Sequence, residues 1–376
     1  MANKVTGNSS LAMDTGKKAY KGKKLRVAII GCGGIAQVHM TAYQEIPEVE
    51  VVACCDIVPE RVKNMAEKWN VTKGFCDKTK TPWKKMLKEV KIDAVDICTP
   101  NYVHCAPAVD AANAGCHVMV EKPMAMDPVE CEKMIAAAKK NKIKLAVGFQ
   151  NRYNPKTQFL KRAKDEGQFG DIMFVKVQAL RRRGIPNWGV FGQKKLQGGG
   201  PMIDIGVHLV EASHYFLGAP KPVAAVGRTW TYLGDKPSEV VCPWPGWDYK
   251  TYTVEDLAIG QIRFDNGALM QIEASFAAHI EKNVFNFTFA GTKGGGSWDP
   301  AKIYTDRAGT MIDVSPNYLP DGEFQILFKY KLQNWVDAIL KGTELTAPGE
   351  AGLMVQKILD GIYRSAAKGG KEVEIK

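Results

Sequence analysis

An aspartate and a histidine lie four residues apart in the stretch GGGPMIDIGVHLV, residues 198–210. If this stretch is helical, Asp204 and His208 share one face, a turn apart. A histidine with an ordinary pKa near ~6.5 can accept and return a proton near neutrality. Asp204 could orient the imidazole or bind a substrate hydroxyl. The same two residues also suit a buried, hydrogen-bonded histidine beside a capping aspartate, and the residue types alone leave both interpretations open.

A lysine ends the stretch HVMVEKP, residues 117–123, which has the pattern of a buried strand. Ligands bind at the carboxyl edge of the strands in open α/β sheets. Lys122 at that edge could donate a hydrogen bond to a substrate oxygen and stabilise negative charge that develops on it. The other interpretation is a solvated lysine at the end of a strand, and position alone does not decide between the two.

The first 150 residues contain the elements that must position Lys122. Short apolar runs suited to strands buried on both faces alternate with amphipathic helical patterns. The predicted strands are 25–30, 49–56, 93–100, 117–123 and 144–150, and the predicted helices lie in 31–46, 59–69, 103–115 and 128–142. This regular alternation predicts a doubly wound parallel sheet, the α/β architecture of Rossmann domains.

The turn GCGGIA, residues 31–36, fits the dinucleotide fingerprint G-x-G-x-x-G/A. Gly31 permits a tight turn, Gly33 lets the backbone approach a pyrophosphate, and Ala36 lets helix and strand pack closely. The pyrophosphate would bind at the helix N-terminus, where Gly34 and Ile35 lie. Because the turn stands between a predicted strand and a predicted helix, it predicts a bound dinucleotide.

An acidic residue, Asp56, ends the second predicted strand 20 residues after the fingerprint. A carboxylate there accepts hydrogen bonds from ribose hydroxyls and repels a 2′-phosphate. Ile57 and Val58 supply no cation, although Arg61 is close in sequence. NAD is therefore the expected cofactor, with NADP the less favoured alternative.

The second half of the chain has strand-like segments without long helices between them. These segments are 171–180, 222–232, 255–264, 267–278 and 284–294, and helical patterns cover 156–167, 324–342 and 349–370. Asn266 and Gly267 have the pattern of a hairpin turn. We expect a basic arm over 1–23, a nucleotide-binding domain over 24–150, and an α+β domain over 151–376 with an open, mainly antiparallel sheet.

A Pro- and Trp-rich insertion, residues 234–252, separates two of these strands. Long loops inside compact domains are uncommon and are often functional. Its aromatic residues could stack on a sugar or an aryl group, or they could fix the loop or fill an oligomer contact; they are Trp244, Trp247, Tyr249 and Tyr252.

Composition excludes several classes of protein. The net charge is +11, but residues 1–26 hold seven basic residues against Asp14 alone, and no nucleic-acid motif accompanies them. No run of 18 apolar residues exists, so no membrane span is expected. Nine cysteines without a Cys-x-x-Cys pair indicate reduced, mostly buried thiols rather than disulfides or structural zinc. With no export signal in the N-terminal residues, a cytoplasmic protein without a metal is expected.

Five motifs together resemble the Gfo/Idh/MocA oxidoreductases. They are GCGGIA at 31–36, EKP at 121–123, GFQNRYNP at 148–155, GGGPMIDIGVH at 198–208 and the closing GEAGLMVQKILDGIYRSAAKG at 349–369. The resemblance covers about residues 24–376. It implies a Rossmann domain followed by an open sheet whose outer face makes a homo-oligomer.

The resemblance also implies NAD(P)-dependent oxidation of a secondary alcohol on a sugar or cyclitol. Lys122 would lie beside nicotinamide and substrate, and Asp204 and His208 would complete the catalytic triad. Cofactor contacts are implied for Thr99, Pro100, Asn101, His104 and Glu121, and contacts with cofactor or substrate for Arg152, Tyr153 and Trp188. The glycines at 198–200 would let the backbone pass close to cofactor and substrate.

The leading hypothesis is an NAD-dependent dehydrogenase that oxidises a ring hydroxyl of a sugar or glycoside, favouring the 3-hydroxyl. His208 would be the general base, Lys122 would stabilise the developing alkoxide, and Asp204 would orient His208 and the sugar. Three alternatives are an inositol or cyclitol 2-dehydrogenase, a redox-neutral glycosidase that uses bound NAD, and a non-catalytic nucleotide-sensing regulator.

Overall fold

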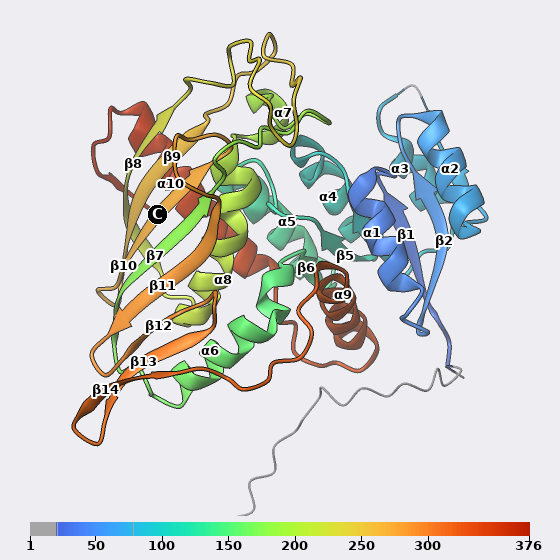
Figure 1. Ribbon diagram of the computed structural model, residues 1–376. Coiled ribbons are helices and arrows are strands. Elements are labelled where there is room, and N and C mark those ends of the chain that lie inside the picture. Colours follow the sequence, from blue (N-terminus) through green and yellow to red (C-terminus); the bar gives the residue numbers. More distant parts are fainter. Residues whose placement is uncertain (1–19, 21, 78) are drawn as a thin grey trace, which may run out of the picture.

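The first half of the chain forms a six-stranded parallel sheet in the computed structural model, which describes residues 20, 22–77 and 79–376 (Figure 1). The strand order is β3-β2-β1-β4-β5-β6. The strands are β1 (Leu25–Ile30), β2 (Val49–Cys55), β3 (Gly74–Phe75), β4 (Ala94–Ile97), β5 (His117–Val120) and β6 (Leu145–Val147). This confirms the predicted Rossmann architecture. Among the described residues of this half, β3, the helix α3 and the short 3-10 helices Asn101–Val103 and Gln150–Tyr153 were not expected from the sequence.

Helices cover both faces of this sheet because its strands are apolar on both sides. The helices are α1 (Gly34–Tyr43), α2 (Pro59–Trp69), α3 (Pro82–Glu89), α4 (Cys105–Asn113) and α5 (Pro128–Lys140). Val27 and Ile29 pack with α1 and α2, whereas Ala28 and Ile30 pack with α3 to α5. The start of α5 shows the local signals: Pro128 is its first residue, and the carboxylate of Asp127 accepts a hydrogen bond from Glu130 N at 2.8 Å.

The second half forms a nine-stranded sheet in the order β14-β13-β12-β11-β7-β10-β9-β8-β15. The strands are β7 (Ile172–Leu180), β8 (Pro222–Trp230), β9 (Leu257–Phe264), β10 (Leu269–Ser275), β11 (Val284–Gly291), β12 (Gly295–Ser297), β13 (Lys302–Arg307), β14 (Thr310–Val314) and β15 (Val373–Glu374). All neighbours are antiparallel except β7 and β10. The five expected strands are confirmed, as is the hairpin at Asn266–Gly267, and four short strands extend the sheet at its edges.

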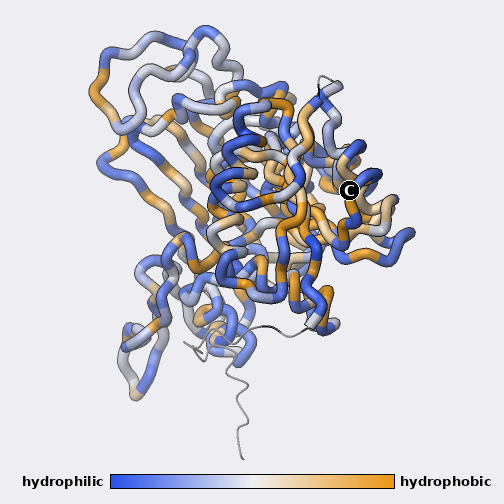
Figure 2. Tube along the Cα trace, turned by 90° about the vertical axis from the view of Figure 1, so that its right-hand side faces the viewer, coloured by the Kyte–Doolittle hydropathy of each residue, from blue (hydrophilic) through white to orange (hydrophobic). Residues whose placement is uncertain are grey.

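One face of this second sheet is covered by helices. They are α6 (Pro155–Asp165), α8 (Val207–Leu217) and α10 (Gly349–Ala367), with α8 and α10 against the strands and α6 against α8. Figure 1 shows these helices between the two sheets, while the opposite face of the large sheet is open. The most hydrophobic segments of the chain run through the interior, and the outlying loops are mostly hydrophilic (Figure 2).

Helix α9 (Phe324–Leu340) returns from the second half to the first domain (Figure 1). It packs on α1, and its Phe328, Leu332 and Trp335 are buried in the same core cluster as Val27 and Ile29. The first domain therefore has a core that includes residues from near the end of the chain, which the spacing of motifs along the sequence does not reveal.

Other expectations concern features outside the two sheets. No disulfide joins the nine cysteines, of which six are buried. Within the described part of the chain, no helix has the length and apolar character needed to cross a bilayer. Residues 1–19 and 21 of the expected basic arm lie outside the described residues.

Candidate active site

A cavity of about 730 Å³ lies at the carboxyl edge of the six-stranded sheet. Its walls come from the segments that follow β1, β2, β4 and β5, together with α3, the loop 188–191, the short helix α7 (Lys194–Gln197) and the turn η3 (Met202–Gly206). Predicted site residues that line it are Gly31, Gly33, Gly34, Ile35, Asp56, Thr99, Pro100, Asn101, Glu121, Lys122, Trp188 and Asp204. Two domains thus enclose one cavity at the edge where ligands bind in such sheets.

The glycine turn after β1 leaves room for a ligand. Gly31 has φ +93°, and a Cβ there would lie 2.8 Å from the carbonyl oxygen of Cys98. A Cβ on Gly33 or Gly34 would instead meet nothing within 4 Å, so this part of the turn is open towards the cavity. Because Gly34 also begins α1, unpaired amides and the positive end of the helix dipole face an incoming anion. The turn fits a pyrophosphate.

Asp56 lies beside the glycine turn, and two basic residues line the same part of the cavity. Its Oδ2 accepts a hydrogen bond from Cys32 N at 2.8 Å, and its Oδ1 accepts one from Val58 N at 2.9 Å. Arg61 and Lys80 also line the cavity. Lys80 belongs to no recognisable sequence motif, so its place in the cavity wall could not be predicted. The ribose end of the cavity therefore combines the carboxylate expected for NAD with two cations.

Two buried polar atoms in the cavity wall have no hydrogen-bond partner among the described residues. They are Oγ1 of Thr99 and Oε1 of Gln197. Buried polar groups are almost always paired, so these atoms are available to a bound molecule. Asn101 donates to the carbonyl of Gln197 at 2.8 Å, which fixes the loop across the cavity. Together with the open glycine turn, these groups fit a dinucleotide.

His104 does not line the cavity but supports its wall. Its ring nitrogens each lie 2.8 Å from a backbone carbonyl oxygen, one of Thr99 and one of Pro123. The imidazole is fully buried between the two loops. His104 therefore ties the loop after β4 to the EKP loop after β5. Ala36 is also buried, and it packs where the first helix meets the sheet.

Lys122 and Asp204 meet across the two domains. Lys122 Nζ donates to the backbone carbonyl of Asp204 at 2.9 Å and lies 3.2 Å from its Oδ1. The side chains are 16% and 15% exposed, so both still face the cavity. An ammonium group has three N–H donors, and these contacts use two of them. The third remains for a substrate oxygen.

A π-turn carries Asp204 into this position. The turn η3 immediately precedes α8, and its start is held by Glu255, whose carboxylate accepts hydrogen bonds from Gly200 N at 3.0 Å and Met202 N at 3.4 Å. Burial raises the pKa of Glu255, and Tyr363 donates a hydrogen bond to it at 2.6 Å. Such single π-helical turns are rare and are frequently found at functional sites.

The glycines at 198–200 have a different structural role from the one expected. A Cβ on Gly200 would lie 2.4 Å from the carbonyl oxygen of Glu255, and one on Gly199 would lie 2.1 Å from the hydroxyl of Tyr363. These two glycines are needed because the backbone passes close to the second domain's own residues, which hold η3 in place. Cofactor and substrate are not what requires a glycine at these two positions.

His208 stands in the first turn of α8 and contacts Gln150 rather than Asp204. Its Nδ1 lies 3.4 Å from Nε2 of Gln150, and its carbonyl accepts a hydrogen bond from Asn151 at 3.4 Å. The wider π-turn changes the helical spacing, so Asp204 points to Lys122 instead of towards His208. Burial, followed by the charge of Lys122, holds the pKa of His208 well below its ordinary value. The prediction that Asp204 contacts and orients His208 is therefore wrong.

Beneath Lys122 lies a buried ionic cluster that the sequence did not predict. Glu121 accepts hydrogen bonds from Lys331 of α9 and from His39 at 3.0 Å, and His39 also contacts Asp96 at 2.6 Å. Burial opposes ionisation of Glu121, but Lys331 and His39 outweigh it and hold its pKa well below the ordinary value. The spacing of Leu327, Lys331 and Trp335 places this lysine on the buried face of α9, which is the signal that could have identified it.

Arg152 and Tyr153 do not line the cavity. Arg152 is 3% exposed, forms an ion pair with Glu211 and donates to the carbonyl of Thr346 at 2.6 Å. The hydroxyl of Tyr153 donates to Asn334 at 2.9 Å. These side chains therefore join the start of the second domain to α8 and to the segment around α9. Gln150 and Asn151 of the GFQNRYNP motif contact His208, which itself does not line the cavity.

Aromatic residues close the side of the cavity that faces the insertion. Trp188 is 49% exposed and lines the cavity, and its ring centroid lies 4.9 Å from that of Trp244 in an edge-to-face arrangement. The guanidinium of Arg181 stacks on Trp244 at 4.9 Å. Burial lowers the pKa of Arg181, although the charge of Asp204 opposes that shift. Trp247 and Tyr252 are buried and fix the insertion instead. Arg181, in the segment RRRGIPNWG, is a candidate site residue that sequence reasoning missed.

Comparisons with known proteins match both halves of the chain. The NAD-binding Rossmann fold of the GFO_IDH_MocA oxidoreductase family matches residues 25–149, and the C-terminal alpha/beta domain of that family matches residues 161–375. D-glucoside 3-dehydrogenase of Escherichia coli (strain K12) is 36% identical over 356 residues, which cover 94% of this chain and 98% of that protein.

Solved structures resemble the whole described fold. Levoglucosan dehydrogenase in complex with NADH and levoglucosan has a TM-score of 0.80 at 25% identity, over 94% of this chain and all of the other. The aldose-aldose oxidoreductase of Caulobacter crescentus has a TM-score of 0.76 at 26% identity, with the same coverage. With its NAD-binding domain, its second domain and the cavity between them, the chain belongs to the Gfo/Idh/MocA family of oxidoreductases.

Proposed function

We propose that this protein is an NAD-dependent dehydrogenase that oxidises a secondary ring hydroxyl of a sugar or glycoside, favouring the 3-hydroxyl. The observation that carries the proposal is the Lys122–Asp204 pair, which joins the two domains at the wall of the dinucleotide cavity. A nearby neutral histidine and an exposed tryptophan support it further. The relative named D-glucoside 3-dehydrogenase supports the choice of the 3-hydroxyl.

Bound NAD supplies the acceptor for the hydride that leaves the ring carbon. The remaining N–H donor of Lys122 binds the oxygen of the reacting hydroxyl and stabilises the negative charge that develops on it. Asp204 fixes the ammonium through its carboxylate and its backbone carbonyl. A sugar hydroxyl can also donate to Oδ2 of Asp204, which would orient the ring.

His208 receives the proton of the reacting hydroxyl. Its lowered pKa keeps the imidazole neutral at neutral pH, as a general base requires. Oε1 of Gln150 has no partner among the described residues, and the two ends of an amide are interchangeable by rotation. With that oxygen turned towards Nδ1–H of His208, the Nε2 atom carries the lone pair that accepts the proton.

Steady-state assays with NAD and a panel of substrates test this function. Glucosides and hexoses should give NADH, and the rate should collapse in Lys122→Ala and His208→Ala variants that still bind NAD. Activity confined to inositols or to non-sugar alcohols would refute the sugar assignment. Release of free sugar without net NADH would instead indicate the redox-neutral glycosidase, and variants as active as the parent would refute the catalytic roles.

The open face of the large sheet supports a homo-oligomer. Val226, Trp230 and Ile259 lie on this face of β8 and β9, and each is 36–39% exposed. Such apolar residues grouped on a broad sheet face are typical of a surface covered by a partner. Light scattering should give a mass that is a multiple of the chain's, and Trp230→Lys should lower it; a monomeric parent would refute this assembly.

A further inference from the structure

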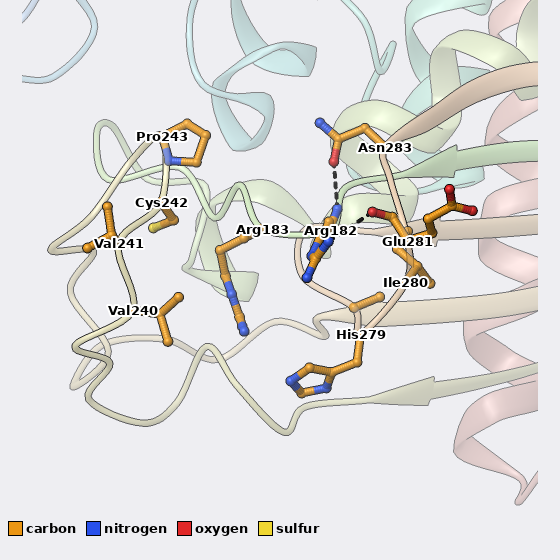
Figure 3. Close-up of a pocket in the computed structure, with 11 residues that line it drawn as sticks. Arg182, Arg183, Val240, Val241, Cys242, Pro243, His279, Ile280, Glu281 and Asn283 are labelled. Atoms are coloured by element: carbon orange, nitrogen blue, oxygen red, sulfur yellow. Dashed lines mark hydrogen bonds between the residues drawn. The ribbon is translucent and has the colours of Figure 1, made fainter.

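A second cavity, of about 700 Å³, lies between the start of the loop after β7, the insertion and the segment before β11 (Figure 3). The insertion contributes Val240 to Pro243, and the segment before β11 contributes Ala278 to Glu281 and Asn283. Arg182 and Arg183 complete the wall. None of these residues belongs to the dinucleotide cavity, so this second cavity needs its own explanation.

The two arginines of the second cavity differ in how they are held. The guanidinium of Arg182 donates to the carbonyl of Glu281 at 2.9 Å, and its backbone N–H donates to Asn283 at 2.7 Å. Arg183 is half-buried, and within residues 20, 22–77 and 79–376 no acceptor binds its guanidinium. Figure 3 shows Arg183 extending towards the space between Val240 and His279. A cation with five donors thus faces a cavity without a partner.

The charges around the second cavity favour an anion. Among the described residues, Glu281 is the single acidic one that lines it, and its carboxylate points away from Arg183 (Figure 3). The guanidinium fork matches the geometry of a carboxylate or phosphate and binds either through two parallel hydrogen bonds. Val240, Pro243 and Ile280 offer apolar contacts for the carbon skeleton that carries such a group.

A row of contacting side chains leads from the active site to the second cavity. Trp188 lines the dinucleotide cavity, Trp244 contacts it edge to face, and Pro243, the neighbour of Trp244, lines the second cavity. Arg181 stacks on the same Trp244. Arg181, which stacks on Trp244, and Arg183, which lines the second cavity, therefore come from one short segment of chain.

We propose that the second cavity is a subsite for a negatively charged aglycone of the glycoside whose sugar is oxidised at Lys122. This inference rests on the function proposed above. The sugar occupies the space beside Lys122 and Asp204, the aglycone passes along Trp188 and Trp244, and its carboxylate or phosphate group binds Arg183. Arg182, already fixed by Glu281 and Asn283, adds positive charge to the subsite.

A matched pair of substrates tests the charge preference. Phenyl β-D-glucoside and 4-carboxyphenyl β-D-glucoside differ by one carboxylate, and kcat/KM is measured for each with saturating NAD. The parent enzyme should prefer the carboxylated glucoside at least threefold. Arg183→Gln should lower kcat/KM for that substrate about tenfold, since a charge-assisted bidentate contact is lost, and should change the neutral one less than twofold.

Two further variants make the result specific. Lys282→Gln removes the same charge from an exposed neighbour that does not line the cavity, and it should leave the preference intact. Arg183→Glu should transfer the preference to a 4-(aminomethyl)phenyl glucoside. The subsite is refuted, and the dehydrogenase function stands, if the parent oxidises both glucosides with equal kcat/KM. The same conclusion follows if Arg183→Gln lowers kcat/KM for both substrates equally. Absence of NADH with every glucoside refutes both.

Discussion

Lys122 and Asp204 come from different domains, and Nζ of the lysine lies 3.2 Å from Oδ1 of the aspartate and 2.9 Å from its backbone carbonyl oxygen. The lysine follows β5 of the Rossmann sheet, and the aspartate stands in the π-turn before α8. The contact therefore forms only when both domains hold their relative position. Binding of a substrate by this pair therefore also depends on the relative position of the two domains.

Removal of either member of this pair should reduce catalysis more than cofactor binding. Lys122→Ala should lower kcat/KM by roughly 10³-fold and Asp204→Asn by roughly 10²-fold, as for loss of a charge-stabilising group. The Kd for NADH, measured by fluorescence, should change less than about threefold. Lys195→Ala, at an exposed lysine of α7, is the control and should be neutral. A Lys122→Ala enzyme with a tenth of the parent activity would contradict the assignment.

The pH dependence of kcat/KM should report the low pKa of His208. A base must be unprotonated to accept a proton, and burial together with Lys122 lowers the pKa of this imidazole well below 6.5. The acidic limb of the profile should therefore fall below pH 6.5, with full activity of this group at pH 7. An acidic limb above pH 7 would contradict the account.

Gln150→Glu should shift that limb in a defined direction. A carboxylate beside the imidazole favours its charged form, so the pKa of His208 should rise and the acidic limb should move to higher pH. Gln150→Leu removes the contact without adding charge, and should lower kcat more than it changes the affinity for NADH. Identical pH profiles for parent and Gln150→Glu would exclude a working contact between the two residues.

Asp56 should control the choice between NAD and NADP. Its carboxylate repels a 2′-phosphate, while Arg61 and Lys80 in the same wall would attract one. Asp56→Asn keeps an acceptor for the bond from Cys32 N and should raise the ratio of NADP to NAD efficiency by about tenfold or more. Adding Arg61→Gln should reverse part of that gain. An unchanged ratio would show that Asp56 does not select the cofactor.

Lys331→Met should destabilise the protein because it removes the ammonium group that pairs with the buried carboxylate of Glu121. Breaking a buried pair of this kind costs about 3–5 kcal/mol, whereas an exposed pair contributes at most about 1 kcal/mol. Lys329→Met on the same helix is the matched control, since its partner Glu45 is 54% exposed. Thermal unfolding should show a clear loss of Tm for the first variant alone. Equal Tm values for both would contradict the buried pair.

The Rossmann half of the fold could be predicted because its signals are local. Buried strands, helix starts and the turn at Gly31 each occupy a few consecutive residues, and Asp56 lies at a fixed distance from them. The short strands β12 to β15 lacked such signals because they are held by their neighbours in the sheet rather than by their own pattern.

The lining of the cavity could be predicted only in part, because Arg152, Tyr153 and His208 were expected at the site but do not line the cavity. Lys122, Asp204 and Trp188 line one cavity as expected. Periodicity assumed an ordinary helix around Asp204, and the π-turn held by Glu255 changed its partner. Lys331 contacts Glu121 and Arg181 stacks on Trp244 across large separations in sequence, and only the folded chain brings these pairs together.

Transfer of deuterium from a labelled sugar tests the central claim most directly. Phenyl β-D-glucoside labelled with deuterium at C3 is incubated with NAD and the protein, and the reduced cofactor is analysed by mass spectrometry. Oxidation at C3 should give reduced cofactor that carries one deuterium from the C3-labelled glucoside and none from glucosides labelled at C2 or C4. Unlabelled reduced cofactor from the C3-labelled sugar, or no reduced cofactor at all, would contradict it.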